Sequence, residues 1–271
     1  MFKPKSRPKG WSINRMIPNM LTLLALSAGL TSIRYGLGGQ WEKALFSIGI
    51  AAVLDALDGR IARLLKGTSK FGAELDSLSD FVCFGVAPAM ILYLWTMQTI
   101  GRIGWAFSLL FAICCALRLA RFNTDLEEPE KPAWAFNFFT GVPSPAGAGI
   151  VLMPLMLYVQ TDSQFFAKPA VVGIFMVVTG ALLVSKIPTF SFKQFKVPHS
   201  LVLPVLLGVG AFAAVLLTEP WIALLGILAA YLTSLPFSVR SYARFQRKEA
   251  ELKGEVVNLE NKTEKQNNET D

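Results

Sequence analysis

The sequence predicts an all-α protein, a polytopic transmembrane helical bundle of about eight transmembrane helices. Three observations support this fold class. Hydrophobic residues make up 53% of the 271 residues and charged residues only 17%, a composition typical of membrane proteins. Apolar runs long enough to cross a bilayer recur along the chain. Most Lys and Arg residues lie near the ends of these runs, in the connections or in the two terminal segments.

The predicted helices follow one another with short connections. The first apolar run opens at Pro18-Asn19 and no convincing cleavage site follows it, so we expect a retained transmembrane helix and not a signal peptide. The second and third runs are interrupted by acidic residues, yet each is long enough to span the membrane. The expected spans cover residues 17–37, 40–66, 71–97, 102–122, 143–160, 168–187, 199–217 and 220–238.

These spans form one transmembrane domain, residues 17–240, between two polar segments. Residues 1–16 are basic, and residues 241–271 form a polar tail that we expect to be largely disordered. With the N-terminus in the cytoplasm, basic residues concentrate on the cytoplasmic side, and the opposite side keeps only Arg34, Lys43, Arg102 and Lys168. This bias predicts a multi-pass protein of the cell inner (cytoplasmic) membrane, with both polar segments inside.

The net charge of +7 does not indicate a nucleic-acid partner, because the basic residues are spread over loop ends and form no single patch. Anionic membrane lipids and anionic substrates fit this distribution better. Cys83, Cys114 and Cys115 lie in apolar runs without metal-ligand spacing. The single histidine, His199, excludes a site built from several histidines.

Acidic residues interrupt the second and third predicted helices at Asp55, Asp58, Asp76 and Asp80. The spacing within each pair places both acids on one helix face. The connection KGTSK is short, so both pairs meet at the cytoplasmic face. A charged side chain at membrane depth is costly unless it is paired, hydrated or bound to a metal, and the sequence offers no matching set of buried cations. The four acids therefore predict a site for Mg²⁺, Mn²⁺ or Ca²⁺, with room for two ions.

Small and basic residues accompany these acids. Gly59 and Ala62 remove side-chain bulk from the second helix, where a ligand or a neighbouring helix can approach. Arg63 can contact a phosphate or anchor the helix at the membrane interface. Arg118 and Arg121 are three residues apart near the cytoplasmic end of the fourth helix. They can face one polar cavity, or they can act as anchors of the positive-inside type.

The acidic motif resembles the signature of the CDP-alcohol phosphatidyltransferases and matches it at every fixed position. It reads Asp55-x2-Asp58-Gly59-x2-Ala62-Arg63-x8-Gly72-x3-Asp76-x3-Asp80. The resemblance implies transfer of a phosphatidyl group from CDP-diacylglycerol to an alcohol, with release of CMP and with two Mg²⁺ or Mn²⁺ ions as cofactors. It implies that the first three acids bind metal, and that Asp80 is the base near the acceptor hydroxyl and also a metal ligand. It further implies a CDP-lipid site lined by Gly59, Ala62, Arg63 and Gly72. The segment Pro18-Asn19-Met20-Leu21-Thr22 resembles the family's first-helix opening, which implies that Asn19 and Thr22 also face the nucleotide.

Three further segments resemble the members of this family that use L-serine as the acceptor. They are CALRLARFNT (115–124), FFTGVPSPAGAG (138–149) and VSKIPTFSFK (184–193). Serine carries a carboxylate that simple alcohols lack, and arginine is the natural partner of a carboxylate. We therefore expect the acceptor-binding residues to be Arg118, Arg121, Asn123, Ser144 and Lys186. Separately, we expect the protein to form a homodimer.

The expected reaction is a displacement at the β-phosphorus in which Asp80 accepts the proton of the serine hydroxyl. The sequence offers no Ser–His or Cys–His pair for an activated nucleophile, which favours direct transfer over a covalent intermediate. Two alternatives stay open. The first is the same chemistry with glycerol 3-phosphate, inositol phosphate or choline as the acceptor. The second is a divalent-cation transporter, which would place acids near mid-membrane with openings to both faces.

Overall fold

The computed structural model describes residues 13–65, 67, 69–127, 138–190 and 202–242. Within these ranges the chain forms eight continuous helical stretches, a short 3-10 turn at Met97–Ile100 and one pair of three-residue strands. The prediction of an all-α membrane bundle is confirmed. The predicted segments 1–16 and 241–271 lie almost entirely outside the described residues, as does His199, so their character stays a prediction.

Each predicted span falls on one of the eight helical stretches, and the third stretch consists of three consecutive elements. The elements are α1 (Ile13–Leu37), α2 (Trp41–Leu64), α3 (Lys70–Asp80) with η1 (Phe81–Val86) and α4 (Ala87–Trp95), α5 (Arg102–Glu127), α6 (Ser144–Thr161), α7 (Pro169–Val184), α8 (Val202–Thr218) and the C-terminal helix (Pro220–Tyr242).

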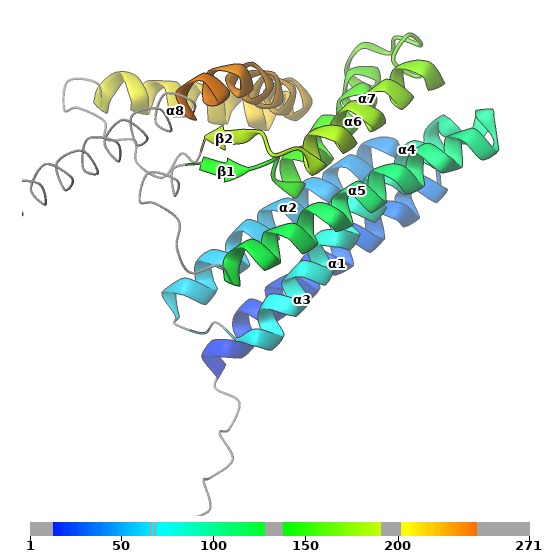
Figure 1. Cartoon of the computed structure of the whole chain (residues 1–271). Coiled ribbons are helices and arrows are strands. Elements are labelled where there is room, and N and C mark those ends of the chain that lie inside the picture. Colours follow the sequence, from blue (N-terminus) through cyan, green and yellow to red (C-terminus); the bar gives the residue numbers. More distant parts are fainter. Residues whose placement is uncertain (1–12, 66, 68, 128–137, 191–201, 243–271) are drawn as a thin grey trace, which may run out of the picture.

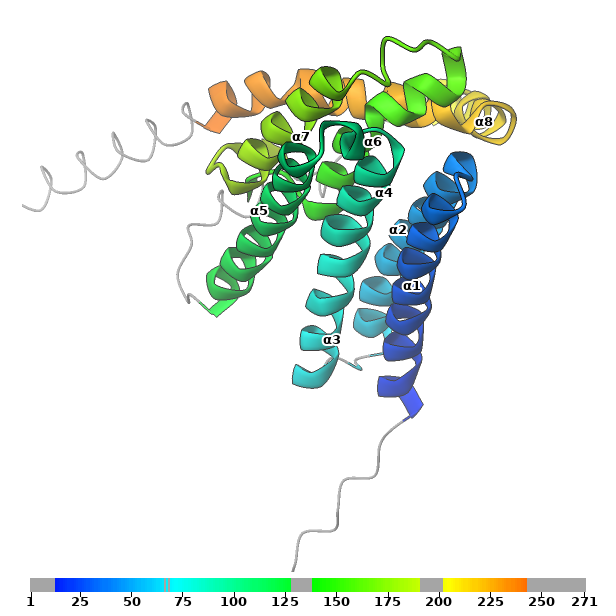
Figure 2. The same ribbon diagram turned by 90° about the vertical axis from the view of Figure 1, so that its right-hand side faces the viewer.

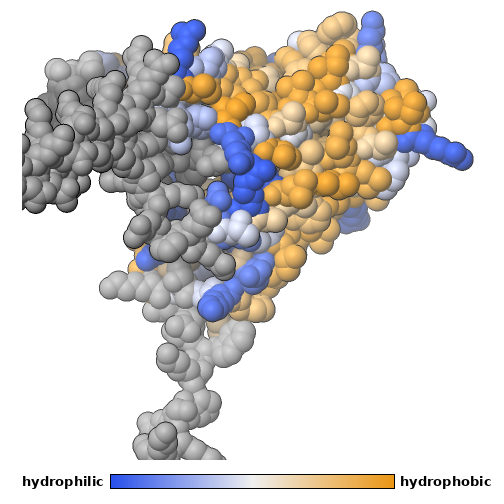
Figure 3. Space-filling model, viewed as in Figure 1, coloured by the Kyte–Doolittle hydropathy of each residue, from blue (hydrophilic) through white to orange (hydrophobic). Residues whose placement is uncertain are grey.

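Four of the described helices are long and apolar enough to cross a membrane. They cover Met16–Leu37, Lys70–Trp95, Arg102–Asp125 and Pro220–Tyr242. The 24 residues of α2 extend over about 36 Å at ~1.5 Å per residue, but its acids interrupt the apolar sequence. Figure 3 shows apolar residues over most of the described surface that is in view. The chain is therefore an integral membrane protein.

Helices α1 to α5 run side by side, with α3 and α4 forming one rod, as Figures 1 and 2 show. The main hydrophobic core joins α2, α4, α5, α6 and α7. Its fully buried members include Leu92 of α4, Phe111 of α5, Leu155 of α6 and Val172 of α7. The acids of α2 and α3 are not members of this core, which therefore holds the helices that carry the acids without including the acids themselves.

The rod formed by α3 and α4 contains a π-helical turn, η1, which the sequence does not predict. The turn begins directly after Asp80. Pro88, at the start of α4, has no N–H to continue the α-helical ladder. The N–H of Ala87 instead reaches the Val82 carbonyl, five residues back, which is the wider bond of a π-helix. The helix that carries Asp76 and Asp80 therefore departs from α-helical geometry directly after its last acid.

Strands β1 (Phe138–Thr140) and β2 (Pro188–Phe190) pair antiparallel, which the sequence also does not predict. They lie just before α6 and just after α7, next to these helices in Figure 1. Their pairing brings together two of the segments that resemble serine-using enzymes. The structure thus joins regions that are far apart in the sequence.

Candidate metal and nucleotide site

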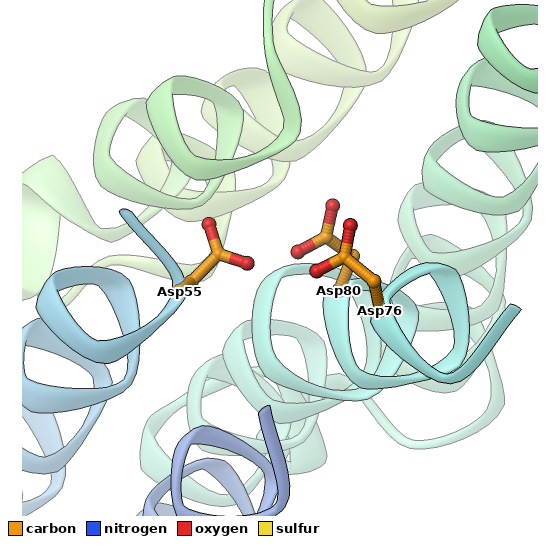
Figure 4. Close-up of side chains that lie close together, drawn as sticks. All are labelled: Asp55, Asp76 and Asp80. Atoms are coloured by element: carbon orange, nitrogen blue, oxygen red, sulfur yellow. The ribbon is translucent and has the colours of Figure 1, made fainter. Parts of the chain in front are cut away.

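Asp55, Asp76 and Asp80 converge between α2 and α3 (Figure 4). One carboxylate oxygen from each residue lies within 4.8 Å of those from the other two. The carboxyl groups of Asp55 and Asp80 lie close enough to interact directly. All three side chains are partly buried. Carboxylates this close repel one another unless a cation or a proton lies between them.

The surroundings of these acids fit a divalent cation. Asp80 Oδ1 is buried and has no hydrogen-bond partner among the described residues, a rare condition for a buried oxygen. Arg118 interacts electrostatically with Asp80, but it donates hydrogen bonds to the Val142 carbonyl and the Ser144 hydroxyl. A set of carboxylate oxygens suits Mg²⁺ or Mn²⁺. Asp55, Asp76 and Asp80 are the residues that would hold it.

Asp58 lies next to this cluster but is held differently. Its side chain is only 4% exposed, and its Oδ2 accepts a hydrogen bond of 2.6 Å from the hydroxyl of Thr22 on α1. Asp58 lies outside the group of three close oxygens and instead lines the neighbouring cavity together with Asp76. Its predicted role as a metal ligand stays a prediction.

A cavity of about 190 Å³ opens beside the acids, between the first turns of α1, the last turns of α2 and the start of α3. Five of the six residues predicted to bind the CDP lipid line it. They are Asn19, Thr22, Gly59, Ala62 and Gly72. A Cβ on Gly59 would meet nothing within 4 Å, so the cavity reaches the backbone of α2. The structure thus brings the acids and the small residues of the motif to one hollow.

Gly72 allows α1 and α3 to meet closely at this cavity. A Cβ on Gly72 would lie 2.8 Å from Asn19 Oδ1 and 3.1 Å from Ser69 Oγ. Ser69 is the N-cap of α3, and its hydroxyl accepts a hydrogen bond of 3.0 Å from the Gly72 N–H. The first turn of α3, where partial positive charge collects, therefore lines the cavity in a fixed position.

Arg63 is the sixth residue of the predicted CDP-lipid site. It is exposed and is not among the described residues that line the cavity. Its Nε donates a hydrogen bond of 2.9 Å to the Gly59 carbonyl, one turn earlier on α2. The side chain therefore starts next to the rim of the cavity, and its contact with a phosphate stays a prediction.

The residues predicted to bind the acceptor fall into two groups. Arg118 and Ser144 are both buried, and Arg118 Nη1 donates a hydrogen bond of 3.2 Å to Ser144 Oγ. The electrostatic interaction of Arg118 with Asp80 places this pair beside the acid cluster. Arg121 instead donates a hydrogen bond of 2.6 Å to the Val184 carbonyl at the end of α7.

Asn123 and Lys186 complete the predicted acceptor residues. Asn123 Nδ2 donates a hydrogen bond of 3.0 Å to Ser77 Oγ, which joins α5 to α3 next to Asp76. Lys186 is exposed in the segment between α7 and β2. Asn123 therefore borders the acid cluster from the side of α5.

Comparison with known proteins identifies the family. The family model CDP-alcohol phosphatidyltransferase matches residues 15–187, which include the acid cluster and the cavity. The chain belongs to the CDP-alcohol phosphatidyltransferase family. A second model, CDP-alcohol phosphatidyltransferase 2, matches residues 200–236. The family expected from the acidic motif is thereby confirmed.

Three curated relatives share one name, CDP-diacylglycerol--serine O-phosphatidyltransferase. The Mycobacterium leprae protein is 38% identical over 240 residues, which cover 88% of this chain and 79% of the relative. The Helicobacter pylori protein is 37% identical over 224 residues, covering 80% of this chain and 88% of the relative. The Bacillus subtilis protein is 35% identical over 178 residues, covering 66% of this chain and 92% of the relative. The predicted likeness to the serine-using enzymes of the family is confirmed.

Two polar residues of the site are absent from the motif. Ser69 precedes the first residue of α3, and a serine before a helix is a recognisable capping signal. Tyr231, on the C-terminal helix, interacts electrostatically with Arg118. No pattern in the sequence indicates Tyr231, because its place depends on how that helix packs against α6.

Proposed function

We propose that the chain transfers a phosphatidyl group from CDP-diacylglycerol to L-serine, giving phosphatidylserine and CMP. The observation that carries the proposal is the position of the Asp55, Asp76 and Asp80 cluster beside a cavity lined by the small residues of the same motif. The names of the relatives that align with most of this chain support serine as the acceptor.

The acid cluster would hold Mg²⁺ or Mn²⁺, and we propose two ions with Asp58 as a further ligand. Ions held there would supply positive charge to offset the negative charge of the pyrophosphate when CMP leaves. Two facts support a metal here. The carboxylates crowd together, and one buried oxygen of Asp80 has no hydrogen-bond partner among the described residues.

The cavity receives the cytidine diphosphate group of the lipid. Gly59 and Ala62 leave room for the ligand, and Asn19 and Thr22 offer polar groups from α1. Arg63, at the rim, extends its guanidinium toward a phosphate. The predicted nucleotide site therefore uses the ends of three helices that the fold already holds together.

The chemical step is attack of the serine hydroxyl oxygen on the β-phosphorus. A new phosphorus–oxygen bond forms, the bond to CMP breaks, and Asp80 accepts the hydroxyl proton. Arg118, held by the Val142 carbonyl and the Ser144 hydroxyl, binds the serine carboxylate. The hydrogen bond of Arg121 to the Val184 carbonyl favours a positioning role for that residue.

We also propose that the protein lies in the cell inner membrane with this site facing the cytoplasm. The distribution of Lys and Arg supports the orientation, and CMP and serine are water-soluble compounds of the cytoplasm. The homodimer stays a prediction, which the mass of the protein in detergent or nanodiscs will test.

The decisive experiment mixes the purified full chain with CDP-diacylglycerol, Mn²⁺ or Mg²⁺, and each acceptor in turn. We expect serine to yield phosphatidylserine and an equal amount of CMP. Preferential reaction with glycerol 3-phosphate, inositol phosphate or choline would overturn the acceptor but keep the chemistry. Metal flux into proteoliposomes without any transfer would support the transporter instead.

A further inference from the structure

The C-terminal helix, Pro220–Tyr242, lies outside residues 15–187, which match the main family model, yet it packs against the helices of the site. A Cβ on Gly149 of α6 would lie 2.8 Å from Leu228 Cδ2, so these two helices are in close contact. At the start of the C-terminal helix, the rings of Trp221 and Phe46 on α2 lie 4.6 Å apart. The helix is therefore anchored to α2 and to the helix that begins at Ser144.

Tyr231 lies on the face of this helix that is turned toward the bundle. Leu228 and Leu235, about one turn to either side, are each only 8% exposed. Tyr231 packs against the main hydrophobic core, and its hydroxyl oxygen is buried. Ser238 is fully buried on the same side. Polar groups on the inward face of a membrane helix serve helix contacts or a ligand.

The Tyr231 hydroxyl lies within electrostatic reach of Arg118, and Arg118 lies within reach of Asp80. Hydrogen bonds to the Val142 carbonyl and the Ser144 hydroxyl hold Arg118. These two bonds use only part of a guanidinium that carries five N–H donors. Polar groups from the C-terminal helix, α5, α6 and α3 thus come together beside the acid that is proposed to take the proton.

We propose that Tyr231 is part of the acceptor site and that its hydroxyl donates a hydrogen bond to the carboxylate of the acceptor, next to Arg118. The inference rests on the proposed function, in which the acceptor is serine. A carboxylate offers two oxygens, so it can accept from a guanidinium and a phenol at once. The nucleotide side of the site then comes from α1, α2 and α3, and the acceptor side from α5, α6 and the C-terminal helix.

The test is Tyr231→Phe, which removes only the hydroxyl. We expect the KM for serine to rise about tenfold, because the variant loses one hydrogen bond to a charged group. The KM for CDP-diacylglycerol and the thermal midpoint stay unchanged. The matched control is Tyr158→Phe, whose ring packs 5.3 Å from Trp95 near the far end of α6 and which leaves both KM values unchanged.

An unchanged serine KM in Tyr231→Phe overturns the inference, and so does an equal rise of both KM values with a lower thermal midpoint, which indicates a structural role. If Tyr231→Phe does not fold, Tyr231→His is the companion variant. Its ring is shorter than that of Tyr, so its N–H group does not reach the place of the hydroxyl, and we expect it to raise the serine KM alone. A normal serine KM in that variant overturns the inference.

The proposed function can fail separately from this inference. If the wild type uses ethanolamine, which lacks the carboxylate, as well as it uses serine, the serine assignment is wrong and the role of Tyr231 falls with it. If the wild type selects serine and Tyr231→Phe has the same serine KM as the wild type, the proposed function stands and only the inference is overturned.

Discussion

The hydroxyl of Thr22 donates a hydrogen bond of 2.6 Å to Asp58 Oδ2 and thereby joins α1 to α2 where the cavity meets the acids. Both side chains are buried at 4% exposure. Ser79 Oγ donates a hydrogen bond of 3.3 Å to the Thr22 carbonyl, which brings α3 to the same point. One residue of α1 therefore holds together the two helices that carry the acidic motif.

Replacing Thr22 by Val removes this hydroxyl but keeps the shape of the side chain. A buried carboxylate oxygen then loses its donor, which costs about 1–3 kcal/mol or more. We expect a lower thermal midpoint and a KM for CDP-diacylglycerol raised about tenfold. Thr31→Val is the control, because the Thr31 hydroxyl bonds to the Ser27 carbonyl of its own helix. Equal effects of the two variants would contradict a special role for Thr22.

Gly72→Ala tests the contact between α1 and α3. The new methyl group would lie 2.8 Å from Asn19 Oδ1 and would push this side chain away from its place at the cavity. Because Asn19 Oδ1 is the end of a flexible side chain, the methyl group displaces it at little cost in stability, and we expect weaker binding of a CDP-lipid analogue in a direct titration. Gly49→Ala serves as the control, since a Cβ there meets nothing within 4 Å. If Gly72→Ala binds the CDP-lipid analogue with normal affinity, Asn19 does not contribute to the nucleotide site.

Metal removal addresses the acid cluster. We expect extensive chelation with EDTA to abolish transfer and Mg²⁺ or Mn²⁺ to restore it, because the proposed reaction needs a cation at these carboxylates to offset the charge of the pyrophosphate. Asp55→Asn and Asp76→Asn should weaken Mn²⁺ binding, which electron paramagnetic resonance measures directly. Full turnover in metal-free protein would exclude a metal-dependent mechanism.

Asp80→Asn separates proton transfer from lipid binding. The amide has nearly the shape of the acid but cannot accept the hydroxyl proton, so we expect kcat to fall about 10²–10⁴-fold. Binding of the CDP lipid should change much less, because the cavity is lined by other residues of α1, α2 and α3. A near-normal kcat would show that another group acts as the base.

Arg118→Lys and Arg121→Lys should have different consequences. Arg118 is fixed beside Ser144 and Asp80. Lysine lacks the planar guanidinium, which can bind a carboxylate through two N–H groups, so the replacement should raise the serine KM more than the CDP-diacylglycerol KM. Arg121 bonds to the carbonyl of Val184, and its replacement should mainly lower the thermal midpoint. If Arg121→Lys raises the serine KM and Arg118→Lys only lowers the thermal midpoint, Arg121 and not Arg118 binds the carboxylate.

The order and type of the helices could be predicted from the sequence because each span carries its own signal of length and apolarity. The acid cluster could be predicted as well, since the spacing of Asp76 and Asp80 on one helix and the short turn after α2 leave few ways to arrange them. The irregular turn η1 has a local cause in Pro88, but a proline alone does not specify a π-helix in advance.

The sequence by itself therefore determined the membrane class, the helices and the acidic motif, all of which depend on residues close together along the chain. Only the tertiary structure decided which polar groups meet. Thr22 on α1 donates a hydrogen bond to Asp58 on α2. Arg118 and Arg121 donate hydrogen bonds to different backbone carbonyls, and Tyr231 interacts electrostatically with Arg118. These relationships arise from packing between distant segments, and a single sequence contains no local pattern that encodes such contacts.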